Sequence, residues 1–147
     1  MNSPTRTREQ AIDRLWETLP PLWSMIRSHV RAEATGHFDI TVEQFQILRL
    51  VRRGFCSISE VAEARNISRP AVSQGAEVLV KKGLLTRIER AADRRYVELA
   101  LTPSGNHLLD EVFGKTRTWM KERMRTLSAE EMASVAEAMQ ALKKMLV

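Results

Sequence analysis

The sequence predicts a mainly helical α+β fold, in which four helices precede a single β-hairpin and two helices follow it. Three observations lead to this fold class. Apolar residues recur every three or four positions near both ends of the 147-residue chain, as amphipathic helices require. Helix start signals recur between those ends, and alternation with a period of two is confined to residues 84–101. The length suits one domain, so we expect a single domain over residues 1–147.

The first expected element is a long helix over about residues 5–35. Pro20 and Pro21 each remove a backbone donor and crowd the preceding turn, so we expect this helix to be bent. Gly36 is expected to end it. The apolar stripe of the helix consists of Ile12, Leu15, Trp16, Leu19, Leu22, Trp23 and Ile26.

Four later helices start at recognisable caps. Three capping boxes, in which a hydroxyl and an amide or carboxylate satisfy free N–H groups reciprocally, predict helices that begin near residues 42, 58 and 129. Thr102 followed by Pro103 marks another start, because proline at a first helical position gives up a donor that would have no partner. Gly54 and Gly83 lie where a left-handed residue would end a helix. The boxes are Thr41 with Gln44, Ser57 with Glu60, and Ser128 with Glu131.

Residues 57–83 have the pattern of a helix-turn-helix. Asn66 lies where the turn needs a left-handed residue, a conformation that asparagine tolerates. Gly75 costs the second helix about 1 kcal/mol relative to alanine, and a close approach to another helix or to DNA would explain it. The residues expected to face inward are Val61, Ala62, Ile67, Val72, Ala76, Leu79 and Val80.

The second helix of this motif carries a polar stripe on its other face. Arg69 and Gln74 have side chains that form bidentate hydrogen bonds with guanine and adenine edges in a major groove. A merely solvated polar face is the alternative interpretation. The candidate DNA-binding residues of this helix are Ser68, Arg69, Pro70, Ser73 and Gln74.

The stretch RIERAADRR at residues 87–95 joins two expected strands and carries four arginines. A basic β-ribbon directly after a recognition helix can rest on phosphates or insert a guanidinium into a narrow minor groove. Asp93 is expected to pair with a neighbouring guanidinium and hold the turn in shape. The candidate wing and phosphate-binding residues are Lys81, Lys82, Arg90, Asp93, Arg94 and Arg95.

The composition agrees with a nucleic-acid partner. The chain has 23 Lys and Arg against 18 Asp and Glu, and this net charge of +5 favours nucleic acid or an anionic surface. No run approaches the roughly 20 apolar residues that span a bilayer, and the polar start MNSPTRTREQ lacks the apolar stretch of a secretory signal. The single cysteine, Cys56, fits a reducing compartment. We therefore expect a cytoplasmic protein that binds double-stranded DNA and no membrane.

The run DRRYVELALT at residues 93–102 resembles the wing signature of the MarR family of winged helix-turn-helix transcription regulators. The resemblance extends upstream through KKGLLTR and covers residues 41–105. It implies a winged-helix DNA-binding region over about residues 41–102 and dimerisation helices over about 5–35 and 103–147. It also implies an obligate homodimer that binds a pseudo-palindromic operator, most often as a repressor. The signature positions are Asp93, Arg95, Leu101 and Thr102.

Many members of this family bind aromatic anions between the dimerisation helices and the winged helix. The resemblance therefore implies a ligand-responsive regulator with a small aromatic or anionic effector. Because the aromatic residues in question recur at helical spacing, the core or the dimer interface is the alternative place for them. The candidate pocket residues are Trp16, Trp23, Phe45 and Phe113.

Histidines offer a candidate metal site. His29, Glu33 and His37 are spaced by four, as ligands on one face of an unbroken helix would be. A second pair of candidate ligands is His107 with Asp110 or Glu111. Ordinary exposed or hydrogen-bonded histidines are the preferred interpretation, so we expect no metal and no other cofactor.

An enzymatic function has little support in the sequence. No HExxH, Walker loop, dinucleotide fingerprint or G-x-S-x-G occurs. Cys56 would be a redox switch if Arg52 or Arg53 stabilised its thiolate, but a buried structural cysteine is the preferred interpretation. We therefore expect a sequence-specific DNA-binding regulator. The alternative, a winged helix used as a protein-interaction module without specific DNA binding, predicts an apolar exposed stripe on the second helix of the motif.

Overall fold

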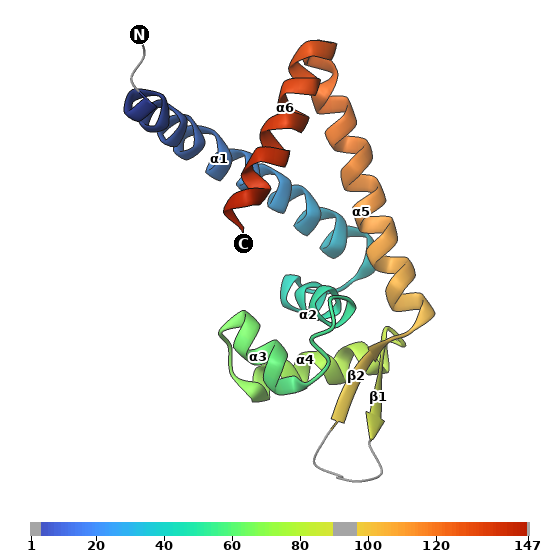
Figure 1. Ribbon diagram of the computed structural model, residues 1–147. Coiled ribbons are helices and arrows are strands. Elements are labelled where there is room, and N and C mark those ends of the chain that lie inside the picture. Colours follow the sequence, from blue (N-terminus) through green and yellow to red (C-terminus); the bar gives the residue numbers. More distant parts are fainter. Residues whose placement is uncertain (1–3, 90–96, 147) are drawn as a thin grey trace.

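The computed structural model describes residues 4–89 and 97–146, and its fold confirms the mainly helical α+β class. Figure 1 shows three helices, α1, α5 and α6, on one side of the molecule and a lobe made of α2, α3, α4 and a hairpin on the other. Two short 3₁₀ turns, Met124–Thr126 and Lys143–Met145, follow α5 and α6. The elements are α1 (Pro4–Phe38), α2 (Val42–Arg52), α3 (Ile58–Arg65), α4 (Arg69–Lys81), β1 (Leu85–Glu89), β2 (Val97–Leu101), α5 (Pro103–Arg123) and α6 (Ala129–Leu142).

The predicted helix starts are confirmed. All three capping boxes form, with the hydroxyl and the N3 side chain bonded to backbone N–H groups in both directions. Thr102 caps α5, because its Oγ1 accepts a hydrogen bond from the Gly105 amide at 3.0 Å. The same hydroxyl donates to the Gly83 carbonyl at 2.6 Å. One side chain therefore joins the end of α4 to the start of α5.

Helix α1 is longer than expected. It continues through Pro20 and Pro21, both of which are exposed, so water can reach the carbonyls that lose their donors. Gly36 does not end the helix, contrary to the prediction. The left-handed conformation that stops α1 falls on Asp39 instead, with φ 50°.

Other left-handed positions were predicted correctly. Gly54 has φ 99° and Gly83 has φ 72°, and each follows the end of a helix. Asn66 has φ 53° and caps the end of α3, so the turn of the helix-turn-helix has the expected geometry.

The core lies within the lobe and extends onto α5. The predicted inward-facing residues of the helix-turn-helix are buried or half-buried, and Leu108, Leu109 and Val112 of α5 pack against them. A Cβ built on Gly75 would lie 2.7 Å from Ile47 Cδ1, so α4 approaches α2 closely at this point. The largest buried side chains are Phe45, Ile47, Leu48, Leu79, Leu85, Leu99 and Leu109.

The hairpin is antiparallel, with Leu85 opposite Leu101 and Glu89 opposite Val97. The segment at Cys56 and Ser57 also pairs with β2, which the sequence pattern did not predict. The Leu99 amide donates a hydrogen bond to the Cys56 carbonyl at 2.7 Å, and Ser57 lies opposite Glu98.

Apolar side chains remain uncovered on α1 and α6. Trp16 is 75% exposed and Trp23 is 55% exposed, and α6 has no buried residue. Among the described residues, no helix combines the length and the apolar character needed to cross a membrane. The exposed apolar residues of the two helices are Ile12, Trp16, Leu19, Leu22, Trp23, Met132, Val135 and Met139.

Candidate functional sites

Helix α4 presents a polar face to solvent. Ser68 caps the helix, with its Oγ accepting from the Ala71 amide at 3.2 Å. The opposite face is buried through Val72, Ala76 and Leu79, so the orientation of α4 in the lobe is determined by its core contacts. Of the candidate DNA-binding residues, Arg69, Pro70 and Gln74 are exposed and Ser73 is half-buried.

The base of the wing contacts α4. Arg87 of β1 donates from Nη2 to the Ser73 carbonyl at 3.4 Å, at the long end of hydrogen-bond geometry. The candidate wing residues Arg90, Asp93, Arg94 and Arg95 lie outside the described residues.

The two candidate phosphate-binding lysines have different surroundings. Lys81 is exposed and pairs with Glu77 one turn earlier, at 3.3 Å between Nζ and Oε1. Lys82 donates to the Asp39 carbonyl and lies 3.6 Å from the Asp39 carboxylate. Lys82 therefore links the end of α4 to the connection between α1 and α2, and a phosphate contact would have to compete with this link.

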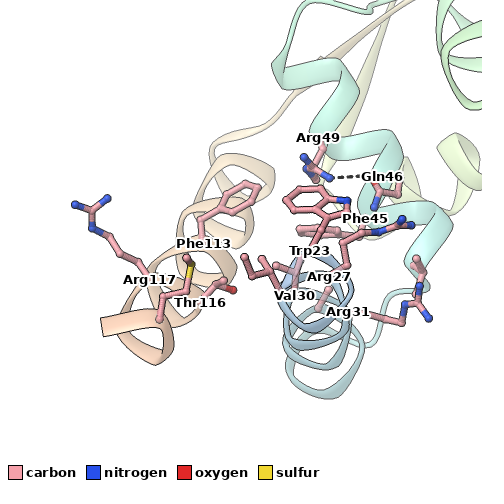
Figure 2. A pocket seen from close by; sticks show the side chains of 14 residues that line it. Trp23, Arg27, Val30, Arg31, Phe45, Gln46, Arg49, Phe113, Thr116 and Arg117 are labelled. Atoms are coloured by element: carbon pink, nitrogen blue, oxygen red, sulfur yellow. Dashed lines mark hydrogen bonds between the residues drawn. The ribbon is translucent and has the colours of Figure 1, made fainter. Parts of the chain in front are cut away.

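A cavity of about 290 Å³ lies between α1, α2 and α5, and Figure 2 shows the side chains around it. Three of the four candidate pocket residues, Trp23, Phe45 and Phe113, line it. The Phe45 and Phe113 rings lie 6.1 Å apart, so the aromatic side chains of α2 and α5 meet here. Trp16 does not line this cavity, because it lies two turns earlier on the exposed part of α1.

Arginines also line the cavity, and the sequence analysis did not identify them. Each of the three aromatic lining residues has an arginine four positions later, on the same face of its helix. Trp16 has a proline at that spacing, so the arginine at i+4 distinguishes the three lining residues from Trp16, whereas Trp119 with Arg123 has the same spacing outside the cavity. The pairs are Trp23 with Arg27, Phe45 with Arg49, and Phe113 with Arg117, and Arg31 is a fourth lining arginine.

The cavity is electropositive. None of its four arginines forms an ion pair with a carboxylate in the part of the chain that the structure describes. Arg49 donates to Gln46 Oε1 at 3.0 Å and lies over the Phe113 ring, 5.7 Å from its centroid. Burial lowers the pKa of Arg49, and repulsion from Arg53, Arg65 and Arg27 lowers it further. An anion at this position would reduce that repulsion.

The four arginines are not equivalent. In Figure 2, Arg31 and Arg117 extend away from the centre of the lining residues, whereas Arg49 lies against Gln46. Arg27 is close enough to Arg49 to affect its pKa. Of the four, Arg49 has its position fixed by the contacts with Gln46 and Phe113, and Arg27 is the other lining arginine whose charge acts on it.

The candidate metal ligands His29, Glu33 and His37 lie on successive turns of α1, and the histidines pair with the glutamate. His29 Nε2 is 3.7 Å from Glu33 Oε1, and His37 Nε2 is 3.2 Å from Glu33 Oε2. The His29 ring stacks on Trp119 of α5, with centroids 4.3 Å apart. Within residues 4–89 and 97–146, no group of three or more His, Cys, Asp or Glu side chains could hold a metal ion. His107 pairs with Glu111 at 3.6 Å.

Cys56 is half-buried rather than fully buried as expected, because it follows the exposed turn at Gly54. Arg52, one of the cations considered for stabilising its thiolate, pairs with Asp110 of α5 at 2.6 Å.

Comparison with known proteins agrees with the fold and with the helix-turn-helix. The model of the MarR family matches residues 38–95. The transcriptional repressor MdtR of Bacillus subtilis is 25% identical over 131 residues, which are 89% of this chain and 84% of that protein. The crystal structure of YusO from B. subtilis superposes with a TM-score of 0.70 at 26% identity, covering 92% of this chain and 96% of that one. A mutant of S. aureus MepR bound to an oligodeoxyribonucleotide superposes with a TM-score of 0.67 at 22% identity, covering 90% and 98%. Residues 38–95, which contain the helix-turn-helix, are therefore similar to the MarR family.

Proposed function

We propose that this chain is a homodimeric transcriptional repressor that binds a pseudo-palindromic DNA site through α4 and responds to an anionic aromatic effector. The observation that carries the proposal is the exposed polar face of α4, held in place by a buried opposite face. MdtR is a repressor and the MepR mutant binds an oligodeoxyribonucleotide, which supports the same role for this chain. A protein-interaction module would instead need an apolar stripe where α4 exposes Arg69 and Gln74.

Gln74 is the best test of base recognition. If it reads a base, Gln74→Ala should weaken binding to the operator by about 1–3 kcal/mol and leave binding to random DNA nearly unchanged. Gln10→Ala, the same change on the exposed part of α1, is the matched control and should change the dissociation constant for neither the operator nor random DNA. Fluorescence anisotropy on both DNA duplexes measures this, and equal losses on the two duplexes would show that Gln74 does not read a base.

The homodimer is supported by the apolar side chains left uncovered on α1 and α6. Such stripes at both ends of the chain can bury each other across a two-fold axis. Sedimentation at micromolar concentration should therefore give twice the chain mass of 16.8 kDa. A single species of the chain mass would refute the homodimer.

The effector is proposed to place its anionic group between Arg27 and Arg49 and its ring against the aromatic wall. Hydrogen bonds to charged groups contribute about 1.5–3 kcal/mol, so Arg49→Gln should weaken binding of 1-naphthoate roughly tenfold or more. Arg117→Gln is the matched control, because that side chain extends away from the cavity centre. Calorimetry checks both variants. Equal binding of 1-naphthoate and neutral 1-naphthalenemethanol would contradict an anion site.

A further inference from the structure

Trp23 belongs to two surfaces at once. It lines the cavity together with Phe45 and Phe113. It also lines a separate apolar hollow between α1 and α6, where its neighbours are Leu19, Leu22 and Met139. More than half of its side chain, 55%, remains exposed in the single chain. One indole therefore separates the cavity from the uncovered apolar face.

We propose that an effector in the cavity and a second copy of this chain contact the same Trp23 side chain, so that filling the cavity stabilises the dimer. This inference rests on the proposed function, because it requires both a homodimer and a ligand in the cavity. The second copy is the natural occupant of the apolar face, since that face is continuous with the exposed apolar residues of α1 and α6.

Filling the cavity should stabilise the dimer and not weaken it, because the exposed Trp23 indole is free to change its rotamer until something packs on it. Without a ligand, the indole must be ordered when the second copy packs on it, and this ordering opposes association. A ligand packed on the cavity side orders the indole beforehand, so the second copy binds to a side chain that is already in place. By linkage, the dimer must then bind the ligand more tightly than the monomer does, by the same factor.

Trp16 provides a matched control within the same helix. It lies seven residues before Trp23 on the same apolar stripe and is 75% exposed, but it does not line the cavity. A change at Trp16 should therefore affect the dimer without affecting its response to a ligand. The conservative pair for comparison is Trp23→Phe and Trp16→Phe, which keep an aromatic ring at each position.

The experiment measures the dimer dissociation constant by diluting a mixture of donor-labelled and acceptor-labelled protein, with and without 1-naphthoate. Each variant is measured at a saturating concentration of 1-naphthoate, chosen from its own calorimetric titration. We expect 1-naphthoate to lower the dimer dissociation constant about fivefold or more in the wild type and in Trp16→Phe. In Trp23→Phe, the decrease should be less than half as large.

Two results would overturn the inference and leave the proposed function intact. The first is an unchanged or raised dimer dissociation constant in wild-type protein that both dimerises and binds 1-naphthoate. The second is a full response in Trp23→Phe. Absence of a dimer, or absence of 1-naphthoate binding to the wild type, would instead refute the proposed function and this inference together.

Discussion

Gly75 allows a sharp test of how α4 is packed. A Cβ at this position would lie 2.7 Å from Cδ1 of Ile47, which is 1% exposed. Real Cβ atoms do not come this close to another heavy atom, so in Gly75→Ala either the isoleucine or the helix has to move. Gly75→Ala should therefore destabilise the fold when residue 47 carries a δ-methyl group and stabilise it when that group is absent.

The magnitudes come from two opposing contributions. Replacing a glycine in a helix interior by alanine stabilises the helix by about 1 kcal/mol. Overpacking a well-packed core costs about 1–3 kcal/mol, so Gly75→Ala should destabilise the wild-type chain by up to ~2 kcal/mol. In the Ile47→Val background, which itself costs about 0.5–1.5 kcal/mol, the δ-methyl group is gone and the same change should stabilise by roughly 1 kcal/mol.

The assay is a double-mutant cycle from urea unfolding of the four proteins at one fixed concentration, because the stability of a dimer depends on concentration. Gly114→Ala is the control, since a Cβ at this helical position meets nothing within 4 Å and should have the same effect in both backgrounds. If Gly75→Ala has the same effect in both backgrounds, Ile47 is not the reason for the glycine. A close approach of the α4 backbone to DNA would then be the remaining explanation.

Substitutions at three further positions have expected outcomes that unfolding measurements check. Gly105→Ala should cost more than Gly75→Ala, because its Cβ would lie 2.2 Å from the Leu84 carbonyl oxygen and no side-chain truncation can relieve that contact. Asn66→Ala should destabilise by about 1 kcal/mol and Asn66→Gly should not, because φ is 53° at this position. Hydrogen bonds from Ser57 lower the pKa of Glu60 below its ordinary 4.5, so its contribution is present at neutral pH and is lost as the pH falls through the lowered pKa. Glu60→Gln should reduce the pH dependence of the urea midpoint in that range, and an unchanged dependence would contradict this assignment.

The helix starts could be predicted from the sequence because their causes are local. Ser57 and Glu60 exchange hydrogen bonds within one turn, so the signal and its effect lie in the same four residues. The end of α1 could not be predicted in this way. Glycine is permitted to leave a helix at Gly36 but is not forced to, whereas the left-handed Asp39 bonds to Lys82, 43 residues later. Contacts between residues so far apart in the sequence leave no periodic pattern in it.

The candidate cavity was predictable in part. Three of the four aromatic residues named from the sequence converge, because α1, α2 and α5 pack against one another around the cavity that these residues line. The sequence alone does not say which stretches of a long amphipathic helix are covered by the rest of the chain, so Trp16 could not be distinguished from Trp23 by its apolar spacing. Nothing in the sequence indicates that Lys82, a candidate phosphate contact, pairs with Asp39, because the two residues are distant in sequence.

The pairing of each cavity aromatic with an arginine one helical turn later has a consequence for how the proposed effector site can evolve. The aromatic side chains contribute the wall of the cavity, whereas the arginines contribute its charge from positions outside the hydrophobic core. Point substitutions at the four lining arginines, Arg27, Arg31, Arg49 and Arg117, would convert an electropositive cavity into a neutral or electronegative one without removing a contact between core residues. A descendant of this chain with such substitutions would accept a neutral or cationic molecule in place of the proposed anionic effector, while it retained α4 and the lobe that holds it.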